Sequence, residues 1–298
     1  MKIRFLIWVL LFNVLVPAMN ASVNVRSTVI TSNDGLGNNV VRHIFQDSRG
    51  FLWMSTLNGL TRYDGHSYVT FRPGTGDEIS LARHHVTRVA EDANNFLWVS
   101  ISSEYFSCYD LKNGCFVDFT GCGEYKEKYM QRLETPDGDN WLWHHQNGAR
   151  KVSFKNGAFS SVVFKKENGM LPSGSVTQII EGTDDVVWIC TNDGLVRVSG
   201  NESRIITTGI HILDAITYKD TLYFVTSKAE IYKADPEGEE VRFVRTVNEK
   251  DTIFDVTSSF SLQDDWIILT PEKGYVFRLP EQEIVPDATM DVPNGRYI

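Results

Sequence analysis

A tryptophan that recurs at a constant interval limits the folds that this chain can adopt. Four tryptophans follow one another at intervals of 45 residues: Trp53, Trp98, Trp143 and Trp188. The Asn58-Gly59 turn after the first of them returns as Asp193-Gly194 after the fourth. A period of about 45 residues, with an apolar strand followed by an Asn-Gly or Asp-Gly turn, is typical of a β-propeller in which each repeat forms one four-stranded blade.

The first repeat shows why such a unit packs against copies of itself. Four runs in it have strand character: 40–46, 51–56, 60–63 and 68–71. The Asn58-Gly59 turn between the second and third runs is a strong hairpin signal. A small sheet with two partly apolar faces is unstable alone, so we expect each sheet to bury those faces against its neighbours. An indole buried there contributes about 2 to 3 kcal/mol relative to exposure, which makes the tryptophans packing residues.

The sequence therefore predicts an all-β fold over residues 22–298, a β-propeller of four-stranded blades. Six blades are expected, at about residues 40–71, 85–119, 129–164, 175–208, 212–247 and 253–285. In the fifth repeat Tyr223 aligns with the tryptophan position, and in the sixth repeat Ile267 aligns with it.

The two ends of the repeat array bear on how the ring closes. Residues 23–31 have β character, and we expect them to supply the outer strand of the last blade, which would remove a free sheet edge. Residues 281–298 are too few for another blade. We therefore expect part of a seven-bladed propeller from a longer, truncated protein, and a closed six-bladed ring is the alternative.

Residues 1–21 have the organisation of a secretory signal peptide. A basic start with Lys2 and Arg4 precedes an apolar run of 12 residues, 5–16, and Ala18 or Ala21 could end the segment as a cleavage site. The run is shorter than the roughly 20 residues of an ordinary membrane span. We expect export and a periplasmic location, and an uncleaved N-terminal anchor is the alternative.

Charge and composition narrow the classes of partner. The formal net charge is −9, and removal of the signal with its two cations would make it −11. Such an acidic domain disfavours nucleic acid or an anionic membrane surface as a partner. The aromatic share of 12% suits blade cores and also carbohydrate contacts, and composition does not separate the two uses.

The cysteines do not form the framework of a small disulfide-rich protein. There are four in the chain: Cys108, Cys115, Cys122 and Cys190. A bridge between Cys108 and Cys122 is compatible with an oxidising compartment, and Cys190 is expected to be a small core residue. No CxxC spacing is present, so we predict no metal site, no redox site and no cofactor.

The first repeat resembles a known family. The run from Val40 through Trp53 and Asn58-Gly59 to Gly65 is similar to the two-component regulator propeller repeat. The lead-in Asn33-Asp34-Gly35-Leu36 and the inter-blade Ser80-Leu81 also resemble that family. The resemblance is closest in repeats one and four, weaker in two and three, and weakest in five and six.

This resemblance implies the periplasmic sensor region of a hybrid two-component system. In gut bacteria such systems commonly control polysaccharide utilisation. The family implies two seven-bladed propellers and a β-sandwich, then a membrane helix, a histidine kinase, a receiver and DNA-binding parts. None of those later parts is found in this sequence, so we expect a binding region that is not itself an enzyme. Its expected partners are an oligosaccharide and the remainder of the sensor or a second copy of it, with no nucleic acid contacted by this region.

Departures from the repeat on one face of the propeller are the candidate ligand-binding residues. The hairpins between second and third strands lie on the same face as the inter-blade connections, and sequences tend to abandon a local rule where function demands it. The departures are Arg83, His84, His85, Ser103, Glu104, Tyr105, His144 and His145. Together they offer guanidinium, imidazole, carboxylate and phenol groups to sugar hydroxyls. Ordinary variation of solvated loop tips is the alternative for each place.

Metal binding and catalysis are less favoured. His144 and His145 are adjacent on an expected strand and should point to opposite faces, so they do not readily ligate one metal. The recurring Asp47, Asp92 and Asp137 precede the first turn of their blades, as turn-capping residues do. Nothing resembles a GxSxG nucleophile motif, and we predict no catalytic residue. A docking scaffold for proteins and a propeller hydrolase or lyase are the alternative functions.

Overall fold

The computed structural model describes residues 27–74, 80–120, 128–247, 255–271 and 273–285, together with the backbone of residues 290–291. The predicted signal peptide and Cys122 lie outside these ranges. In the part of the chain that is described, no helical segment has the length and apolar character needed to cross a bilayer.

The first half of the described chain forms three four-stranded antiparallel sheets in strict chain order. The first sheet contains β1 (Val41–Gln46), β2 (Leu52–Thr56), β3 (Gly59–Tyr63) and β4 (Tyr68–Phe71). The second contains β5 (Val86–Glu91), β6 (Phe96–Ile101), β7 (Tyr105–Asp110) and β8 (Cys115–Val117). The third contains β9 (Gln131–Glu134), β10 (Asn140–His144), β11 (Gly148–Lys155) and β12 (Ala158–Phe164).

The second half repeats the same topology three more times. The fourth sheet contains β13 (Val176–Glu181), β14 (Val186–Thr191), β15 (Gly194–Ser199) and β16 (Glu202–Thr208). The fifth contains β17 (Ile212–Tyr218), β18 (Thr221–Thr226), β19 (Glu230–Ala234) and β20 (Val241–Thr246). The sixth contains β21 (Ser258–Leu262), β22 (Asp265–Leu269), β23 (Lys273–Arg278), β24 (Glu283–Ile284) and the short β25 (Met290–Asp291), which pairs with β23.

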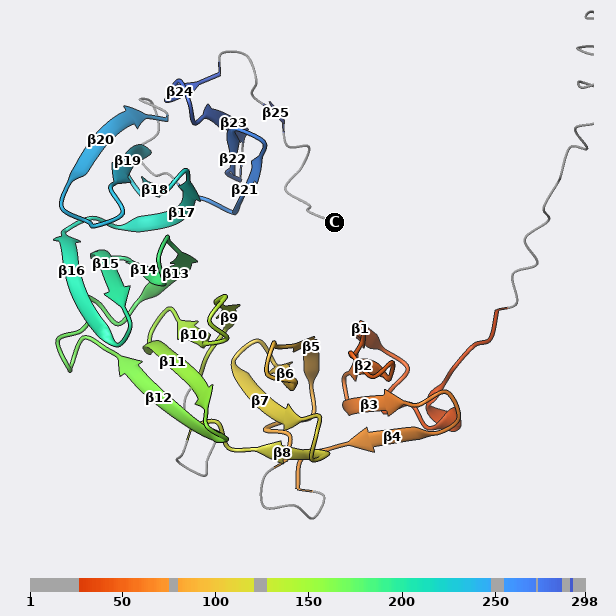
Figure 1. Cartoon of the computed structure of the whole chain (residues 1–298). Helices are drawn as coiled ribbons and strands as arrows, with labels where there is room; N and C mark the ends of the chain where they lie inside the picture. The colour runs from red at the N-terminus through yellow and green to blue at the C-terminus, as the bar shows by residue number, and fades with distance from the viewer. Residues whose placement is uncertain are drawn as a thin grey trace, which may run out of the picture.

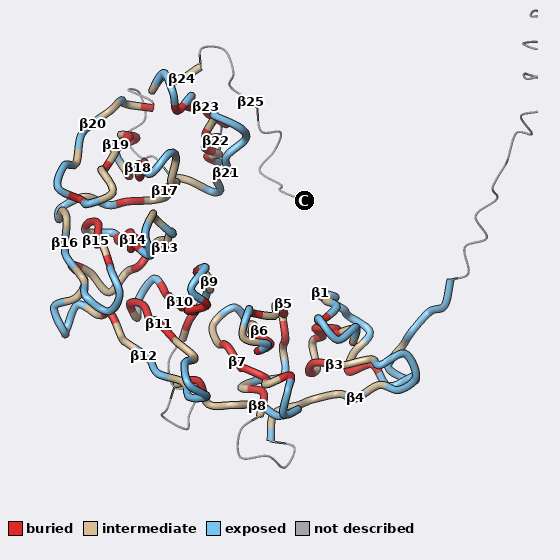
Figure 2. Tube along the Cα trace, in the orientation of Figure 1, coloured by how far each residue is buried: buried red, intermediate tan, exposed pale blue. Residues whose placement is uncertain are grey.

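The six sheets stand side by side around an axis, as blades of a propeller. Figure 1 shows the first strand of each sheet on the inner side of the ring and the fourth strand on the outer side. Buried residues concentrate in the second and third strands (Figure 2). The predicted all-β propeller of four-stranded blades is confirmed.

The hairpin between second and third strands shows how the local sequence dictates the turn. Thr56 Oγ1 accepts a hydrogen bond from Asn58 N at 3.1 Å and donates one to Gly59 O at 2.8 Å. Gly59 has φ +103°, and a Cβ there would lie 2.3 Å from the carbonyl oxygen of Phe71. Glycine is therefore required by both the left-handed backbone and the close approach of β4.

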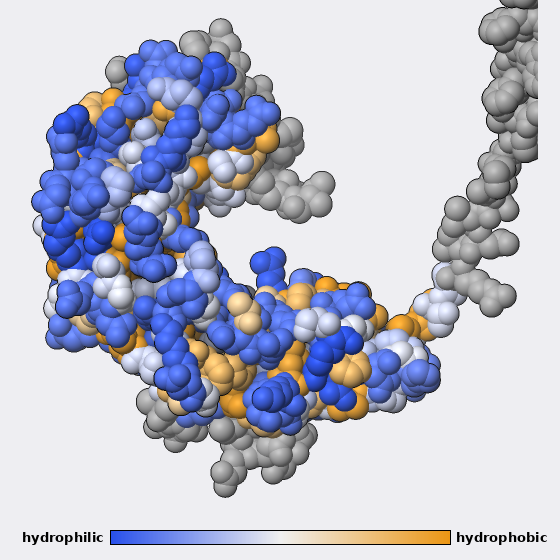
Figure 3. Space-filling model, viewed as in Figure 1, coloured by the Kyte–Doolittle hydropathy of each residue, from blue (hydrophilic) through white to orange (hydrophobic). Residues whose placement is uncertain are grey.

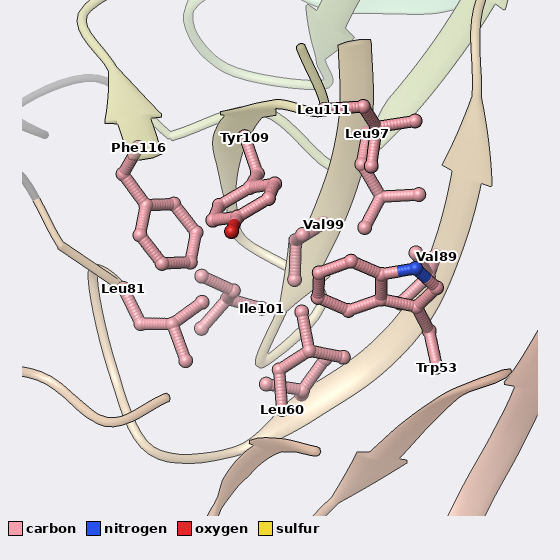
Figure 4. Close-up of a cluster of buried hydrophobic side chains, with 11 residues drawn as sticks. Trp53, Leu60, Leu81, Val89, Leu97, Val99, Ile101, Tyr109, Leu111 and Phe116 are labelled. Carbon is pink, nitrogen blue, oxygen red and sulfur yellow. The ribbon is translucent and has the colours of Figure 1, made fainter. Parts of the chain in front are cut away.

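The tryptophans fill the spaces between neighbouring sheets. Trp53 is completely buried and packs against Val89, Leu97 and Val99 of the second sheet (Figure 4). Its ring also lies edge-on to Tyr109, with centroids 5.3 Å apart. Trp188 packs in the same way against residues of the fifth sheet.

In the third sheet the repeat position is held by Trp141 and not by Trp143. Trp53 lies three residues before Thr56, the last residue of β2, and Trp141 lies three residues before His144, the last residue of β10. Both indoles of β10 pack toward the fourth sheet because residues two apart on a strand share a face. The constant interval at Trp143 is therefore not the structural register.

The same shift corrects the role of Asp137. The backbone bond from Asp47 N to Phe51 O corresponds in the third sheet to a bond from Thr135 N to Asp139 O, so Thr135 takes the turn position. Asp137 lies within that turn, where its carboxylate accepts a hydrogen bond from Thr135 Oγ1 at 2.5 Å.

Asp47 and Asp92 cap the first turn of their blades and also hold the buried indole. Asp92 Oδ1 accepts hydrogen bonds from Asn94 N and Phe96 N, and its Oδ2 accepts from Trp98 Nε1 at 2.7 Å. Asp47 makes the same bond to Trp53 Nε1 at 2.8 Å. These repeated carboxylates therefore have a structural role.

The tryptophan substitutes expected in repeats five and six occupy the predicted position. Tyr223 lies three residues before Thr226 and packs toward the sixth sheet. Ile267 lies three residues before Thr270, whose hydroxyl donates to Lys273 O at 2.9 Å as Thr56 does to Gly59 O.

The ring is open between the sixth and first sheets (Figures 1 and 3), so the closed six-bladed alternative is not what the structure shows. Apolar side chains are exposed on the strands that flank the opening: Ile44 is 61% exposed on β1, and Phe260 and Leu262 are 47% and 61% exposed on β21. Residues 27–31, expected to lie in a closing strand, contain no strand. They lead into a short 3-10 turn (Ser32–Asp34), where Asp34 accepts from the backbone and hydroxyl of Thr31.

The Asp92 cap leads to a stability prediction. Asp92→Ala removes the acceptor of four hydrogen bonds, three of them buried, from Phe96 N, Trp98 Nε1 and Asn140 Nδ2. The change should lower the free energy of unfolding by about 3 to 5 kcal/mol. Asp137→Ala, at an exposed site in the next blade, should cost about 1 kcal/mol or less. The midpoints of urea unfolding provide the measurement, and equal losses in the two variants would contradict the assigned roles.

Candidate functional site

One face of the ring carries the hairpins between second and third strands and the connections between sheets. Backbone hydrogen bonds hold the two together at neighbouring positions. These bonds run from Gly59 N to His84 O (2.7 Å), from Ser102 N to His85 O (2.9 Å) and from Tyr129 N to Glu104 O (2.7 Å). The eight candidate residues therefore belong to one face, as their places in the repeat predict.

The first group of candidates lies where the first sheet meets the second. The guanidinium of Arg83 lies over the ring of Tyr105, 5.3 Å from its centroid. His84 Nδ1 is 3.2 Å from Asn58 Oδ1 in the first hairpin. Arg83 and His84 are exposed, while His85 is half-buried and its Nε2 has no hydrogen-bond partner among the described residues.

The second group lies where the second sheet meets the third. Glu104 forms an ion pair of 3.1 Å with Lys128. The rings of His144 and His145 stack with centroids 4.3 Å apart and an interplanar angle of 21°. The expectation that the two histidines point to opposite faces is wrong, because His145 lies beyond the end of β10, where strand alternation no longer applies.

His144 is held in its neutral form by its surroundings. Its Nδ1 accepts a hydrogen bond from Gln146 N at 3.0 Å, which requires an unprotonated nitrogen. Burial is the main cause that lowers the pKa of His144; the neighbouring His145 and Lys128 lower that pKa further, and Glu104 opposes them.

The turn of the second sheet holds strained backbone. Ser102 and Ser103 have φ of 52° and 56°, and Glu104 N donates to Ile101 O at 3.1 Å to close the turn. Two consecutive left-handed residues normally favour Asn and Gly. Serines held there cost on the order of 1 kcal/mol or more each, and such strain tends to cluster at functional sites.

A cavity of about 590 Å³ lies between the second and third sheets, beneath this turn. Its polar lining comes from the inner strands β5 and β9 and from neighbouring positions: Thr87, Arg88, Ser100, Ser103, Gln131 and Arg132. Trp98 and Phe106 line its wall. Of the eight candidates, Ser103 alone lines this cavity.

Sequence reasoning missed Arg88 and Arg132, the two arginines of this cavity. Arg132 could have been noticed, because it departs from the repeat pattern. Arg132 pairs with Leu142 of β10, and the equivalent inner-strand positions of other sheets hold Ile44, Val89 and Ile179. An arginine therefore replaces an aliphatic residue in this column of the repeat. These positions are seen to be equivalent only from the pairing of the first and second strands in each folded sheet.

Arg132 is fixed by three neighbours. Its Nε donates to Asn140 Oδ1 at 2.6 Å, its Nη2 donates to Glu134 Oε2 at 2.9 Å, and its guanidinium lies 5.3 Å from the ring centroid of Trp98. Burial lowers the pKa of Arg132, although nearby Glu134 and Asp92 oppose that effect. An arginine remains protonated under such conditions.

Arg88 differs from Arg132 in having no such support. Its side chain is exposed and makes no hydrogen bond or ion pair with another residue that the structure describes. Burial lowers the pKa of His43 on β1, and the positive charge of Arg88 lowers that pKa further.

A second cavity of about 660 Å³ lies at the first turns of the blades, on the opposite face. Its lining includes Arg49, Asn94 and Asn113, and none of the eight candidates. Arg49 bridges the first two sheets there by donating to the carbonyl oxygen of Leu111.

The described residues contain no cluster of possible metal ligands, and two of the described cysteines are buried. No three His, Cys, Asp or Glu side chains among these residues come together to hold a metal ion. Cys108 and Cys190 are buried, and burial raises the pKa of both thiols. Cys190 packs in the core as expected, whereas a bridge to Cys122 involves a residue outside the description.

The two inner strands of the first sheet lie in a segment that matches a known family model. The model of the family named two component regulator propeller matches residues 35–58, which include β1 and β2. These residues are therefore similar to a two component regulator propeller repeat. No curated protein matches the chain.

Several solved structures have a fold similar to that of this chain. The extracellular domain of BT3049, described as a hybrid two component system of B. thetaiotaomicron, is 17% identical with a TM-score of 0.52, over 90% of this chain and 38% of that one. The extracellular domain of BT4673 from the same organism is 18% identical with a TM-score of 0.53, over 88% of this chain and 38% of that one. A β-propeller domain of Myceliophteria thermophila Cps50 (Swd1) is 12% identical with a TM-score of 0.51, over 85% of this chain and 87% of that one. The chain thus spans little more than a third of the two bacterial structures, and at these identities the likeness concerns the fold.

The neutral His144 predicts a pH dependence of stability. Because its folded pKa lies below the unfolded value, the unfolded chain binds the proton first as the pH falls, and stability is lost from the unfolded pKa down to the folded pKa. We expect the free energy of unfolding to fall less between pH 7 and pH 5 in His144→Gln than in the wild type. His66→Gln, at an exposed turn of the first sheet, should keep the wild-type slope, and a His144→Gln slope equal to the wild-type slope would contradict the assignment.

Proposed function

We propose that this chain is the extracytoplasmic, ligand-sensing propeller of a hybrid two-component system and that it recognises oligosaccharides released from polysaccharides. The observation that carries the proposal is the regulator repeat at residues 35–58, which forms the inner strand pair of a propeller blade. The extracellular domains of BT3049 and BT4673, which share this fold, belong to proteins described as hybrid two component systems.

The chemistry of the candidate face supports a sugar ligand. Arg83 and Tyr105 pair at one sheet junction, and Glu104, Lys128 and the stacked histidines gather at the next. Cavities of several hundred cubic ångströms with a few convergent polar groups are typical small-molecule sites. The adjoining 590 Å³ cavity is of that size.

The proposed role is binding and not turnover. Asp47 and Asp92, which recur with the period, are bound to their own turns and indoles. In this proposal the signal passes to a kinase outside this chain, and hydrolysis of any oligosaccharide by the pure chain would overturn it.

We propose the remainder of a longer sensor, or a second copy of the chain, as the protein partner. The exposed Ile44, Phe260 and Leu262 on either side of the opening support a protein contact there, because exposed apolar patches mark interaction surfaces. The same residues favour a docking scaffold as the second candidate function. Binding of a protein partner without any response to oligosaccharides would support that second candidate.

Calorimetry of the purified chain against a panel of oligosaccharides tests the main proposal. We expect saturable binding of at least one of them. Glu104→Gln should weaken that binding about fivefold, because one charged hydrogen bond is lost, whereas Glu239→Gln in the fourth-to-fifth sheet region should leave it unchanged. No binding across the panel would contradict the proposal.

Export of the chain can be tested by its mass. In a periplasmic fraction we expect a mature protein that begins at Met19 or Ser22, after cleavage at Ala18 or Ala21. Intact-mass spectrometry makes the measurement. A chain that keeps Met1 and stays in the cytoplasm would contradict the periplasmic location.

A further inference from the structure

The cavity between the second and third sheets has a charge opposite to that of the chain. The formal net charge of the protein is −9. Among the residues that line the cavity, however, Arg88 and Arg132 are charged and no carboxylate is present. Glu134 and Asp92 lie behind Arg132, outside the lining, whereas Arg88 forms no ion pair with another described residue.

The guanidinium groups of Arg132 and Arg88 differ in how firmly the protein holds them before a ligand binds. Arg132 is held by Asn140 and Glu134 and lies over Trp98, which fixes its plane in advance. Glu134 is itself anchored to the second sheet by a hydrogen bond from Ala93 N at 2.7 Å. A guanidinium fixed in this way loses little conformational entropy when it binds an anion.

Arg88 completes the pair from the other wall of the cavity. It projects from β5 of the second sheet, whereas Arg132 comes from β9 of the third sheet. Because Arg88 is exposed and makes no hydrogen bond or ion pair with another described residue, its guanidinium is available to a ligand in the cavity.

The remaining lining suits a sugar more than a simple ion. Thr87, Ser100 and Ser103 bring hydroxyl groups, and Gln131 brings an amide with both donor and acceptor atoms. These groups can both donate hydrogen bonds to sugar hydroxyls and accept hydrogen bonds from them. The volume of about 590 Å³ exceeds what a sulfate or phosphate ion needs.

We propose that this cavity binds an acidic oligosaccharide, one that carries carboxylate or sulfate groups, with Arg88 and Arg132 as the anion contacts. This inference rests on the proposed function, since it names the class of oligosaccharide that the propeller senses. Guanidinium groups recognise carboxylate and sulfate oxygens through charge-assisted, often bidentate, hydrogen bonds. An acidic ligand in this cavity would therefore meet two guanidinium groups and no carboxylate among the lining residues.

The test compares acidic and neutral probes on the full chain. Trigalacturonate provides the carboxylate arm, a sulfated chondroitin disaccharide provides the sulfate arm, and cellotriose provides the neutral arm. We expect one acidic probe to bind at least tenfold more tightly than cellotriose in calorimetry, with an affinity that falls between 50 and 300 mM sodium chloride. The arm that binds distinguishes a uronate from a sulfated sugar.

Two arginine variants locate the binding. Arg88→Gln should weaken the acidic probe at least tenfold and keep the wild-type thermal midpoint, because Arg88 is exposed and without partners among the described residues. Arg42→Gln is the matched control, since Arg42 is also exposed on an inner strand and unpartnered in the described chain. It should leave the affinity unchanged.

The outcomes separate this inference from the proposed function. Binding of cellotriose with no preference for acidic probes, or an acidic affinity unaffected by Arg88→Gln, would overturn the acidic-ligand inference and leave the sensor proposal standing. Equal losses in Arg88→Gln and Arg42→Gln would also overturn it, since that result indicates general attraction to positive charge. Failure of every oligosaccharide to bind would overturn both.

Discussion

The structure depends on the burial of large side chains between successive sheets. Each sheet presents apolar residues on both faces, and Trp53, Trp98, Trp141, Trp188 and Tyr223 fill the space toward the next sheet. A sheet of this kind is stable only with neighbours, which explains why the blades assemble around an axis. Where the described blades end, the same faces are uncovered, and Ile44 and Leu262 are exposed at the two sides of the opening.

Because packing is confined to the faces of the sheets, the loops and inner strands are free to vary. The first sheet has a Thr-x-Asn-Gly hairpin, while the second sheet replaces it with Ser102 and Ser103 in left-handed conformations. The third sheet replaces an aliphatic residue of its inner strand with Arg132. Both departures meet at one cavity, which is why that junction is the natural place for a ligand.

Most of the fold could be predicted from short-range pattern, and the errors have a common cause. Alternating apolar residues and Gly turns predicted four-stranded blades, and Tyr223 and Ile267 were assigned to the correct position even though the indole is absent there. Trp143 and Asp137 were assigned to the wrong register. The first turn of the third blade has the same length as in the first blade, but the equivalent tryptophan, Trp141, lies 43 residues after Trp98 and 47 residues before Trp188. Counting constant intervals of 45 residues therefore selects Trp143.

The sequence by itself determined the strands, the turns and the face on which Arg83, Glu104 and His144 lie, because each follows from residues close together in the chain. Tertiary structure alone decided that Arg88 and Arg132 share a cavity, that the rings of His144 and His145 stack, and that the ring is open between the sixth and first sheets. The physical reason is that these features arise between sheets or beyond the end of a strand, where the side-chain positions depend on how neighbouring sheets pack and not on local periodicity.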